Sequence, residues 1–111
     1  MSAGVAATDK KRAVSRRFHQ RPELLLRRTL RAQAARSLGM LADPATLPLL
    51  LTALRDPDWW VRMRTGLALT RFGSAGRNAL LAAEVGADPS ARDMARLVLG
   101  LSAQALAEFA A

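Results

Sequence analysis

Arginine and aspartate are the residues through which this sequence could do chemistry. Arg31, Arg62 and Arg92 recur at intervals of 31 and 30 residues, at the same position of a repeated stretch. A guanidinium binds a carboxylate or a phosphate through two parallel hydrogen bonds, so this row could bind an anionic ligand. It could instead pair with aspartates that precede prolines, and both interpretations are open at this point. These aspartates are Asp43, Asp56 and Asp88.

A second group of residues could bind a partner. Trp60, Arg64, Leu67 and Arg71 follow one another at steps of four, three and four, which places them on one stripe of a helix. Trp and Arg dominate the energy of protein interfaces, so Trp60, Arg64 and Arg71 are candidate partner-binding residues. The alternative is an arginine stacked on an indole for stability alone. Trp59 points about 100° away from Trp60, so we expect one indole to pack on the preceding hairpin and the other to be exposed.

Basic charge is concentrated near the N-terminus. Residues 10–36 contain ten basic residues and one acid, whereas the rest of the chain contains seven bases and eight acids. Residues 1–21 have no apolar period, so we predict a basic arm that is mostly disordered. Such an arm could dock on an anionic membrane surface, bind the phosphate backbone of a nucleic acid, or be a solvated tail without function. The basic residues of the arm and of the helix that follows it are Lys10, Lys11, Arg12, Arg16, Arg17, Arg21, Arg27 and Arg28.

Few features of the sequence point to catalysis or to a bound metal. The chain has no cysteine and a single histidine, His19, which leaves no thiol nucleophile and no Ser/His/Asp set within the repeats. No His/Asp/Glu cluster has metal-ligand spacing and no Gly-rich phosphate loop follows a strand. We therefore expect no cofactor and no metal, and we predict that the protein is not an enzyme.

The composition also bears on where the protein acts. No apolar run is long enough to span a bilayer, and the N-terminus lacks the apolar core of a secretory signal. We therefore expect a cytoplasmic protein, or one peripheral to the inner face of the membrane. The high ratio of Arg to Lys favours a bacterial source.

An internal repeat indicates the elements that position these residues. Residues 30–42, 61–73 and 91–103 align with one another, and each copy places the same kind of residue in the same column. A fixed period of this length is typical of a solenoid, in which each unit buries its apolar face only against its neighbours. Ala and Leu dominate the composition, while Pro and Gly are sparse, which favours helix almost throughout.

The predicted helices begin at proline or at aspartate. Pro22 can occupy the first turn of a helix, where its missing N–H costs nothing. Each of the three Asp-Pro pairs then supplies an N-cap and a first-turn proline for a later helix. The first helix has an apolar face at spacings of three and four. That face is Leu26, Leu30, Ala34, Leu38 and Leu41.

The remaining boundaries follow from glycine and serine. Ser74 can cap a helix that reaches Val85, and Gly100 ends the helix before a short last one of about two turns. These elements form helical hairpins, of which the last has a truncated second helix. The units of the repeat domain, 22–111, are residues 22–55, 56–86 and 87–111 approximately.

The string DPATLPLLLTALRDPDWWVRMRTGLALTRFG resembles HEAT repeats, in particular the short bacterial repeats of the phycobilin lyase type. The family pattern is an Asp-Pro turn, a branched apolar residue followed by Arg, a small pair, and Leu-Gly; Thr70 departs from the Gly. The resemblance covers roughly residues 22–103. The matching residues are Asp56, Pro57, Val61, Arg62, Thr65, Gly66 and Leu69 in the second copy, and Leu30, Arg31, Ala34, Ala35, Leu38 and Gly39 in the first.

This resemblance implies an all-α fold: a short right-handed α-solenoid, an armadillo/HEAT-like superhelix, of about three helical hairpins. In HEAT-like proteins the matching arginine usually bonds the turn aspartate, so it implies that Arg31, Arg62 and Arg92 form a structural ladder with the aspartates. It implies no lyase activity, because the chain has no recognisable bilin site. HEAT-like hydroxylases bind iron through His-Glu pairs, which the repeats here lack.

The last helix, in SAQALAEFAA, has two interpretations. Leu101, Ala105, Leu106 and Phe109 are apolar and have few polar neighbours, whereas a solenoid needs a polar cap at each end. The helix could fold back to close the stack. It could instead leave an open end that joins another chain or a second copy of itself.

These features favour protein–protein interaction as the function. We expect a small adaptor or scaffold with a basic arm that docks on an acidic partner or an anionic membrane surface. Its partner surface would be the groove lined by the second helices or the Trp60–Arg71 stripe. The alternative is a nucleic-acid-associated protein that uses the same arm, and a weaker one is a non-catalytic accessory subunit of a lyase or another enzyme.

Overall fold

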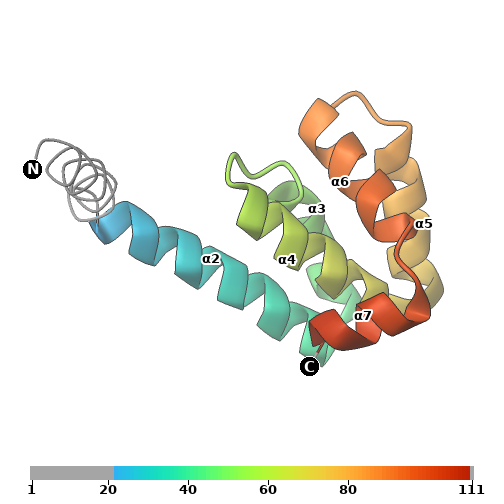
Figure 1. Ribbon diagram of the computed structural model, residues 1–111, viewed down its shortest axis with the longest axis horizontal. Helices are drawn as coiled ribbons and strands as arrows, with labels where there is room; N and C mark the ends of the chain where they lie inside the picture. The colour runs from blue at the N-terminus through green and yellow to red at the C-terminus, as the bar shows by residue number, and fades with distance from the viewer. Residues whose placement is uncertain (1–21, 111) are drawn as a thin grey trace, which may run out of the picture.

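The computed structural model describes residues 22–110, and the predicted arm, 1–21, lies outside them (Figure 1). Within this described part all the regular elements are helical. They are α2 (Pro22–Leu41), the 3₁₀ turn η1 (Pro44–Thr46), α3 (Leu47–Ala53), α4 (Trp59–Leu69), the 3₁₀ turn η2 (Thr70–Phe72), α5 (Gly73–Glu84), α6 (Pro89–Leu99) and α7 (Ala103–Ala110).

The helices stack in two layers (Figure 1). The first layer consists of α2, α4 and α6, in which α2 packs along α4 and α4 packs against α6. The second layer consists of α3 and α5, which pack on the first: α3 against α4, and α5 against α6 and α4. The short all-α solenoid predicted from the repeat is therefore confirmed. The last helix, α7, packs mainly against α4, so the third hairpin does not close as the first two do.

Aspartate caps begin α4, α6 and the turn before α3. Asp43 accepts a hydrogen bond from the Ala45 N–H at 3.0 Å, and Asp88 accepts one from the Ala91 N–H at 2.8 Å. Both caps were predicted from the Asp-Pro pairs and are confirmed.

Two predicted caps are wrong. The N-cap of α4 is Asp58, whose carboxylate accepts from the Val61 N–H at 3.1 Å, and Asp56 lies two residues earlier in the turn. The reason is that Asp56 is already used as an acceptor within the turn. Ser74 does not cap α5 either, because that helix begins at Gly73, whose φ of 61° makes the turn after η2.

Small residues set the spacing of the first-layer helices. A Cβ on Gly39 would lie 2.7 Å from the Cβ of Ala68, and one on Gly66 would lie 2.7 Å from Cγ2 of Val98. Glycine therefore lets α2 approach α4, and α4 approach α6, more closely than any other residue would allow. The larger buried side chains form one core cluster shared by the helices of both layers. They are Leu50, Leu54, Met63, Leu69, Leu80, Met94 and Val98.

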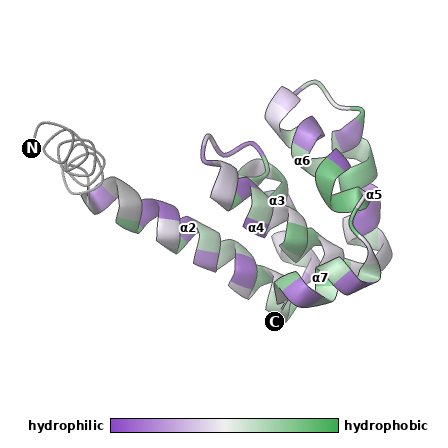
Figure 2. Ribbon diagram, viewed as in Figure 1, coloured by the Kyte–Doolittle hydropathy of each residue, from purple (hydrophilic) through white to green (hydrophobic). Residues whose placement is uncertain are grey.

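The predicted apolar face of α2 is wrong except at Leu38, which is half-buried and packs against the core. Leu30 and Leu41 are 55% and 76% exposed, whereas Ala32 and Ala35 on the opposite side are buried against the stack. Because α2 is the outermost helix of the described stack, nothing described here covers Leu30 and Leu41. The close α2–α4 crossing instead selects the side with the smallest residues. Figure 2 shows hydrophilic and hydrophobic residues alternating along α2.

Candidate partner-binding face

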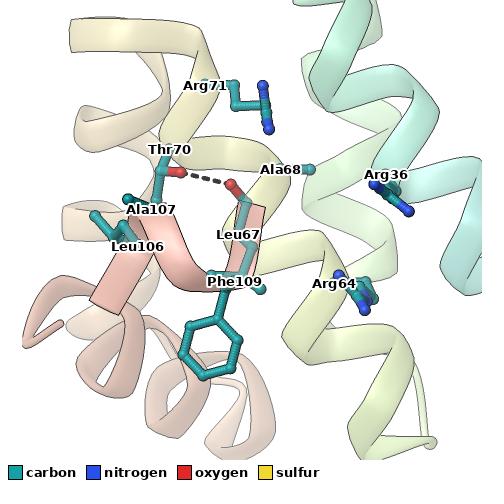
Figure 3. A pocket seen from close by; sticks show the side chains of 9 residues that line it. All are labelled: Arg36, Arg64, Leu67, Ala68, Thr70, Arg71, Leu106, Ala107 and Phe109. Atoms are coloured by element: carbon teal, nitrogen blue, oxygen red, sulfur yellow. Dashed lines mark hydrogen bonds between the residues drawn. The ribbon is translucent and has the colours of Figure 1, made fainter. Parts of the chain in front are cut away.

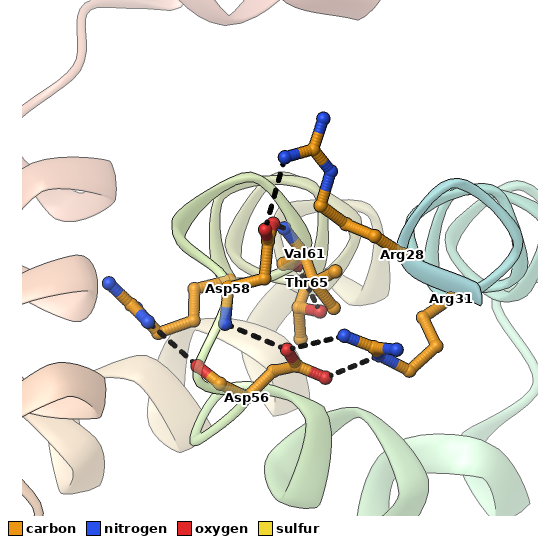
Figure 4. Close-up of polar contacts among 7 residues, drawn as sticks. Arg28, Arg31, Asp56, Asp58, Val61 and Thr65 are labelled. Carbon is orange, nitrogen blue, oxygen red and sulfur yellow. Dashed lines mark hydrogen bonds and ion pairs between the residues drawn. The ribbon is translucent and has the colours of Figure 1, made fainter. Parts of the chain in front are cut away.

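The turn around Asp56 is where the predicted arginine ladder meets an aspartate. Nε of Arg31 donates to Oδ2 of Asp56 at 2.8 Å, and its Nη2 donates to Oδ1 at 3.1 Å, so the pair is bidentate (Figure 4). This hydrogen bond is the main reason that the pKa of Arg31 is raised above its usual value. The pair joins α2 to the turn before α4 and so fixes one unit against the next.

Further groups converge on the same turn. Nη1 of Arg62 donates to the backbone carbonyl of Asp56 at 2.7 Å, and the Asp58 N–H donates to Oδ1 of Asp56 at 2.9 Å. Arg28 lies on α2 and its Nη1 is 3.5 Å from Oδ2 of Asp58 (Figure 4). From the sequence, Arg28 is grouped with the basic arm; Asp58, the second carboxylate of the Asp-Pro-Asp string, was the signal that could have paired it. Arg27 is exposed on α2.

The ladder does not continue along the stack in the same form. Within residues 22–110 the half-buried side chain of Arg92 makes no hydrogen bond or ion pair, and Asp43 and Asp88 serve as caps. The arginine ladder is thus concentrated at one turn, between the first unit and the second. The other predicted arm residues, Lys10, Lys11, Arg12, Arg16, Arg17 and Arg21, lie outside the described residues.

The predicted stripe begins with two tryptophans on the first turn of α4. Cζ of Arg64 lies 4.6 Å from the centroid of the Trp60 ring, which is a cation–π contact. The rings of Trp59 and Trp60 lie 6.5 Å apart and are 52% and 43% exposed. The expectation that one indole packs on the preceding hairpin is therefore wrong. Trp59 instead borders a shallow hollow of 240 Å³ with Met94 and Leu97 of α6.

The stripe ends in a larger hollow beneath the last helix. This hollow, here called the α7 hollow, has a volume of 330 Å³ and lies between α2, α4, η2 and α7 (Figure 3). It brings two predicted residues, Arg64 and Arg71, together with Arg36 of α2, which the sequence did not single out. Its lining is Arg36, Arg64, Leu67, Ala68, Thr70, Arg71, Leu106, Ala107 and Phe109.

The last helix folds back across the stripe. Leu106 is half-buried against the face of α4 that carries Leu67, and Phe109 stays exposed at the rim of the α7 hollow. Of the two interpretations of the C-terminal helix, folding back onto the stack is the one that matches its position. The helix packs on α4, however, and does not cover Leu97 of α6, which stays exposed.

The second helices line a separate groove of 250 Å³. Its walls are mostly apolar and come from α3, α5 and the start of α6. Leu51 is partly exposed there and Leu54 forms the buried floor. Beside the Trp60–Arg71 stripe, this groove is the other candidate partner surface predicted from the sequence. Its lining is Leu51, Leu54, Arg55, Ala79, Ala82, Ala83, Gly86, Ala87, Asp88 and Ala91.

Across residues 22–110, no set of three His, Cys, Asp or Glu side chains is grouped so that it could hold a metal ion. None of the helices described here combines the length and the apolar character needed to cross a membrane.

Comparison with known proteins gives one match. A family model for HEAT repeats matches residues 25–107, which includes nearly all of the described part. No curated protein and no solved structure matches the chain. The match agrees with the HEAT pattern found in the sequence but does not reach the narrower phycobilin lyase type.

Proposed function

We propose, from the premise that this chain belongs to the HEAT repeat family, that its function is to bind another protein as a small adaptor or scaffold. HEAT repeats generally mediate protein–protein interaction, and the family is typically non-catalytic. The class of function thus follows from the family. What is particular to this chain is the surface that it presents to a partner.

The Trp60–Arg71 stripe is the surface we propose. The observation that carries it is the stacked pair of Trp60 and Arg64 on the exposed side of α4. The apolar surface of an exposed indole is unfavourable in water. Burying that surface against a partner would therefore lower the free energy. The stacked guanidinium also holds the indole in one orientation, which reduces the entropy lost on binding. Trp and Arg in this arrangement are typical of interface hot spots.

A pull-down with two tryptophan variants tests the stripe. The tagged full chain, Trp60→Ala and Trp59→Ala are each incubated with nuclease-treated native lysate, and retained proteins are identified by mass spectrometry. We expect a discrete protein to be retained by the wild type and by Trp59→Ala and to be lost from Trp60→Ala. Trp59 is the matched control, because the same indole is removed from a site of similar exposure on another side of α4. Equal retention by all three would exclude the stripe.

The basic arm supports a second candidate. Ten bases against one acid in residues 10–36 favour attraction to an acidic partner, to an anionic membrane surface or to nucleic acid. An adaptor of this kind would act in the bacterial cytoplasm or at the inner face of the membrane. The nucleic-acid alternative predicts binding to DNA or RNA that falls steeply with salt and is lost when residues 1–21 are removed.

Two further alternatives would change what the pull-down retains. An accessory subunit of a lyase or another enzyme would retain a catalytic partner. Self-association through α7 would retain a second copy of this chain.

A further inference from the structure

Three arginines from three different elements line the α7 hollow. Arg36 comes from α2, Arg64 from α4 and Arg71 from η2, and all three line the same 330 Å³ (Figure 3). The other side of the hollow is apolar, because Leu106 and Phe109 of α7 face the arginines there. A ligand in this hollow would therefore meet guanidinium groups on one side and an apolar wall on the other.

The charges of these arginines are not balanced by the rest of the described chain. The ion pairs within residues 22–110 involve Arg28 and Arg31, and no carboxylate lines the α7 hollow. A guanidinium has hydrogen-bond donors and no acceptor. Arg36, Arg64 and Arg71 thus present donors that no described acceptor meets, and together they give the hollow a positive charge. An oxyanion would satisfy the donors and balance that charge.

We infer that the α7 hollow binds an acidic peptide segment of a partner protein, with a carboxylate against the arginines and an apolar side chain against Leu106 and Phe109. The inference deepens the proposed function and rests on it. A hollow of this size lies at the low end of ligand pockets and fits a few side chains. Guanidinium groups bind carboxylates through paired hydrogen bonds of fixed geometry, which gives orientation as well as affinity.

The shape of the site favours a peptide over a membrane or a nucleic acid. A lipid surface is flat, whereas the hollow sets an apolar wall from α7 opposite arginines of α2, α4 and η2, which a peptide with an acidic and an apolar side chain can match. A nucleic-acid strand needs basic groups that follow its phosphates along a groove. Here the three arginines line a single hollow. The other exposed arginines of the second and third units, Arg77 and Arg96, are on α5 and α6.

Fluorescence anisotropy of a short fluorescein-labelled peptide of glutamate and leucine tests the site on the full chain. Arg36→Glu/Arg71→Glu reverses two charges at the hollow, and Arg77→Glu/Arg96→Glu makes the same change in net charge elsewhere. Both doubles keep the basic arm. We expect the hollow double to weaken binding about tenfold or more relative to the wild type. The control double should change it much less, and the same peptide with glutamine in place of glutamate should not bind.

Four outcomes would overturn the inference. Equal weakening by the two doubles would assign the binding to net charge or to the arm. Equal binding of the glutamine peptide would remove the role of the carboxylate. Phosphatidylglycerol vesicles, or an oligonucleotide, that bind in an Arg36- and Arg71-dependent way while the peptide does not would assign the hollow to a different macromolecule. Absence of all peptide binding would overturn it as well.

Intrinsic fluorescence gives a second readout at the same site. The chain has two tryptophans, and Arg64 links one of them to the hollow through its stack on Trp60. Peptide binding should change the indole emission of the wild type and of Trp59→Ala, but not that of Trp60→Ala. If no peptide binds while a lysate protein is still lost from Trp60→Ala, the inference fails and the proposed function stands. If the peptide binds and no protein is retained from lysate, the proposed function fails.

Discussion

The Asp56 turn and the α7 hollow are both lined by arginine, but they differ in what lies opposite the guanidinium groups. At the turn, Arg31 and Arg62 donate to a carboxylate and a carbonyl of the same residue. At the hollow, Arg36, Arg64 and Arg71 share the lining with apolar residues of α7 and with no acid. Arg62 and Arg64 are two residues apart on α4, about 200° around the helix axis, so opposite sides of one helix carry arginines with different roles.

This difference separates a structural arginine from a binding one. A guanidinium that is fully paired within the chain stabilises the fold and has little left to offer a ligand. A guanidinium without an acceptor adds little to the fold and keeps its donors for a partner. Substitutions at the turn should therefore lower stability and spare binding, and substitutions at the hollow should do the reverse.

The largest effect on stability is expected from Asp56→Ala. The change removes the carboxylate that accepts from Arg31 and from the Asp58 N–H, and it leaves charged donors without their partner. We expect the free energy of unfolding to fall by about 2 kcal/mol. Urea denaturation of the full chain, followed by circular dichroism, measures it.

Asp43→Ala is the matched control for that substitution. Asp43 also precedes a proline and accepts one backbone hydrogen bond, but it has no arginine partner among the described residues. Loss of this cap should cost about 1 kcal/mol. An equal loss of stability in the two variants would show that Asp56 acts only as a turn residue and that its pairing with Arg31 adds nothing.

A smaller effect is expected from Arg31→Gln. The side chain of Arg31 is 44% exposed, so water screens its ion pair and we expect a loss of about 1 kcal/mol. The hydrogen bond to Asp56 raises the pKa of Arg31. A raised pKa stabilises the folded state fully below the unfolded pKa, and this contribution is lost only as the pH rises through the folded value.

Arg31→Gln should therefore lower stability by the same amount at about pH 6 and at about pH 9, because Arg31 stays charged in both states throughout that range. Thermal denaturation at the two pH values checks this. A loss that shrinks markedly toward pH 9 would mean that another titrating group, and not the Arg31–Asp56 pair, carries the effect.

The sequence predicted the helical stack because its signals are local and repeated. The aligned copies and the Asp-Pro pairs gave the solenoid and two of the caps, at Asp43 and Asp88. The cap at α4 was misassigned because Asp56 and Asp58 both fit the pattern, and only the folded turn decides which carboxylate faces the helix. The exposed face of α2 was misassigned because the leucine period shows an apolar stripe without showing which neighbour covers it.

The candidate site was predictable to the extent that it follows one helix. The spacing of Trp60, Arg64 and Arg71 placed them on one stripe, and Arg64 does stack on Trp60. Arg36 was missed because it belongs to another unit and has no periodic relation to the stripe. The position of α7 was open for a similar reason, since its apolar residues could be covered by any neighbouring surface.

The smallest effect on stability is expected at the hollow itself, from Arg36→Glu/Arg71→Glu. Neither substitution breaks a hydrogen bond or an ion pair, because no acceptor for Arg36 or Arg71 lies within residues 22–110. We expect the free energy of unfolding to stay within about 0.5 kcal/mol of the wild type. Arg77→Glu/Arg96→Glu, measured beside it in urea, shows what the same change in net charge does on α5 and α6.

If the Asp56 turn and the α7 hollow differ in this way, Arg36→Glu/Arg71→Glu should lose peptide affinity and keep its stability. A fall in stability as large as that of Asp56→Ala would mean that Arg36 and Arg71 support the packing of α7 on α4. The two regions would then have the same structural role, and the donors at the hollow would no longer be available to a partner. Unchanged stability in both doubles, with binding lost only from the first, would separate the two roles of arginine within this one short solenoid.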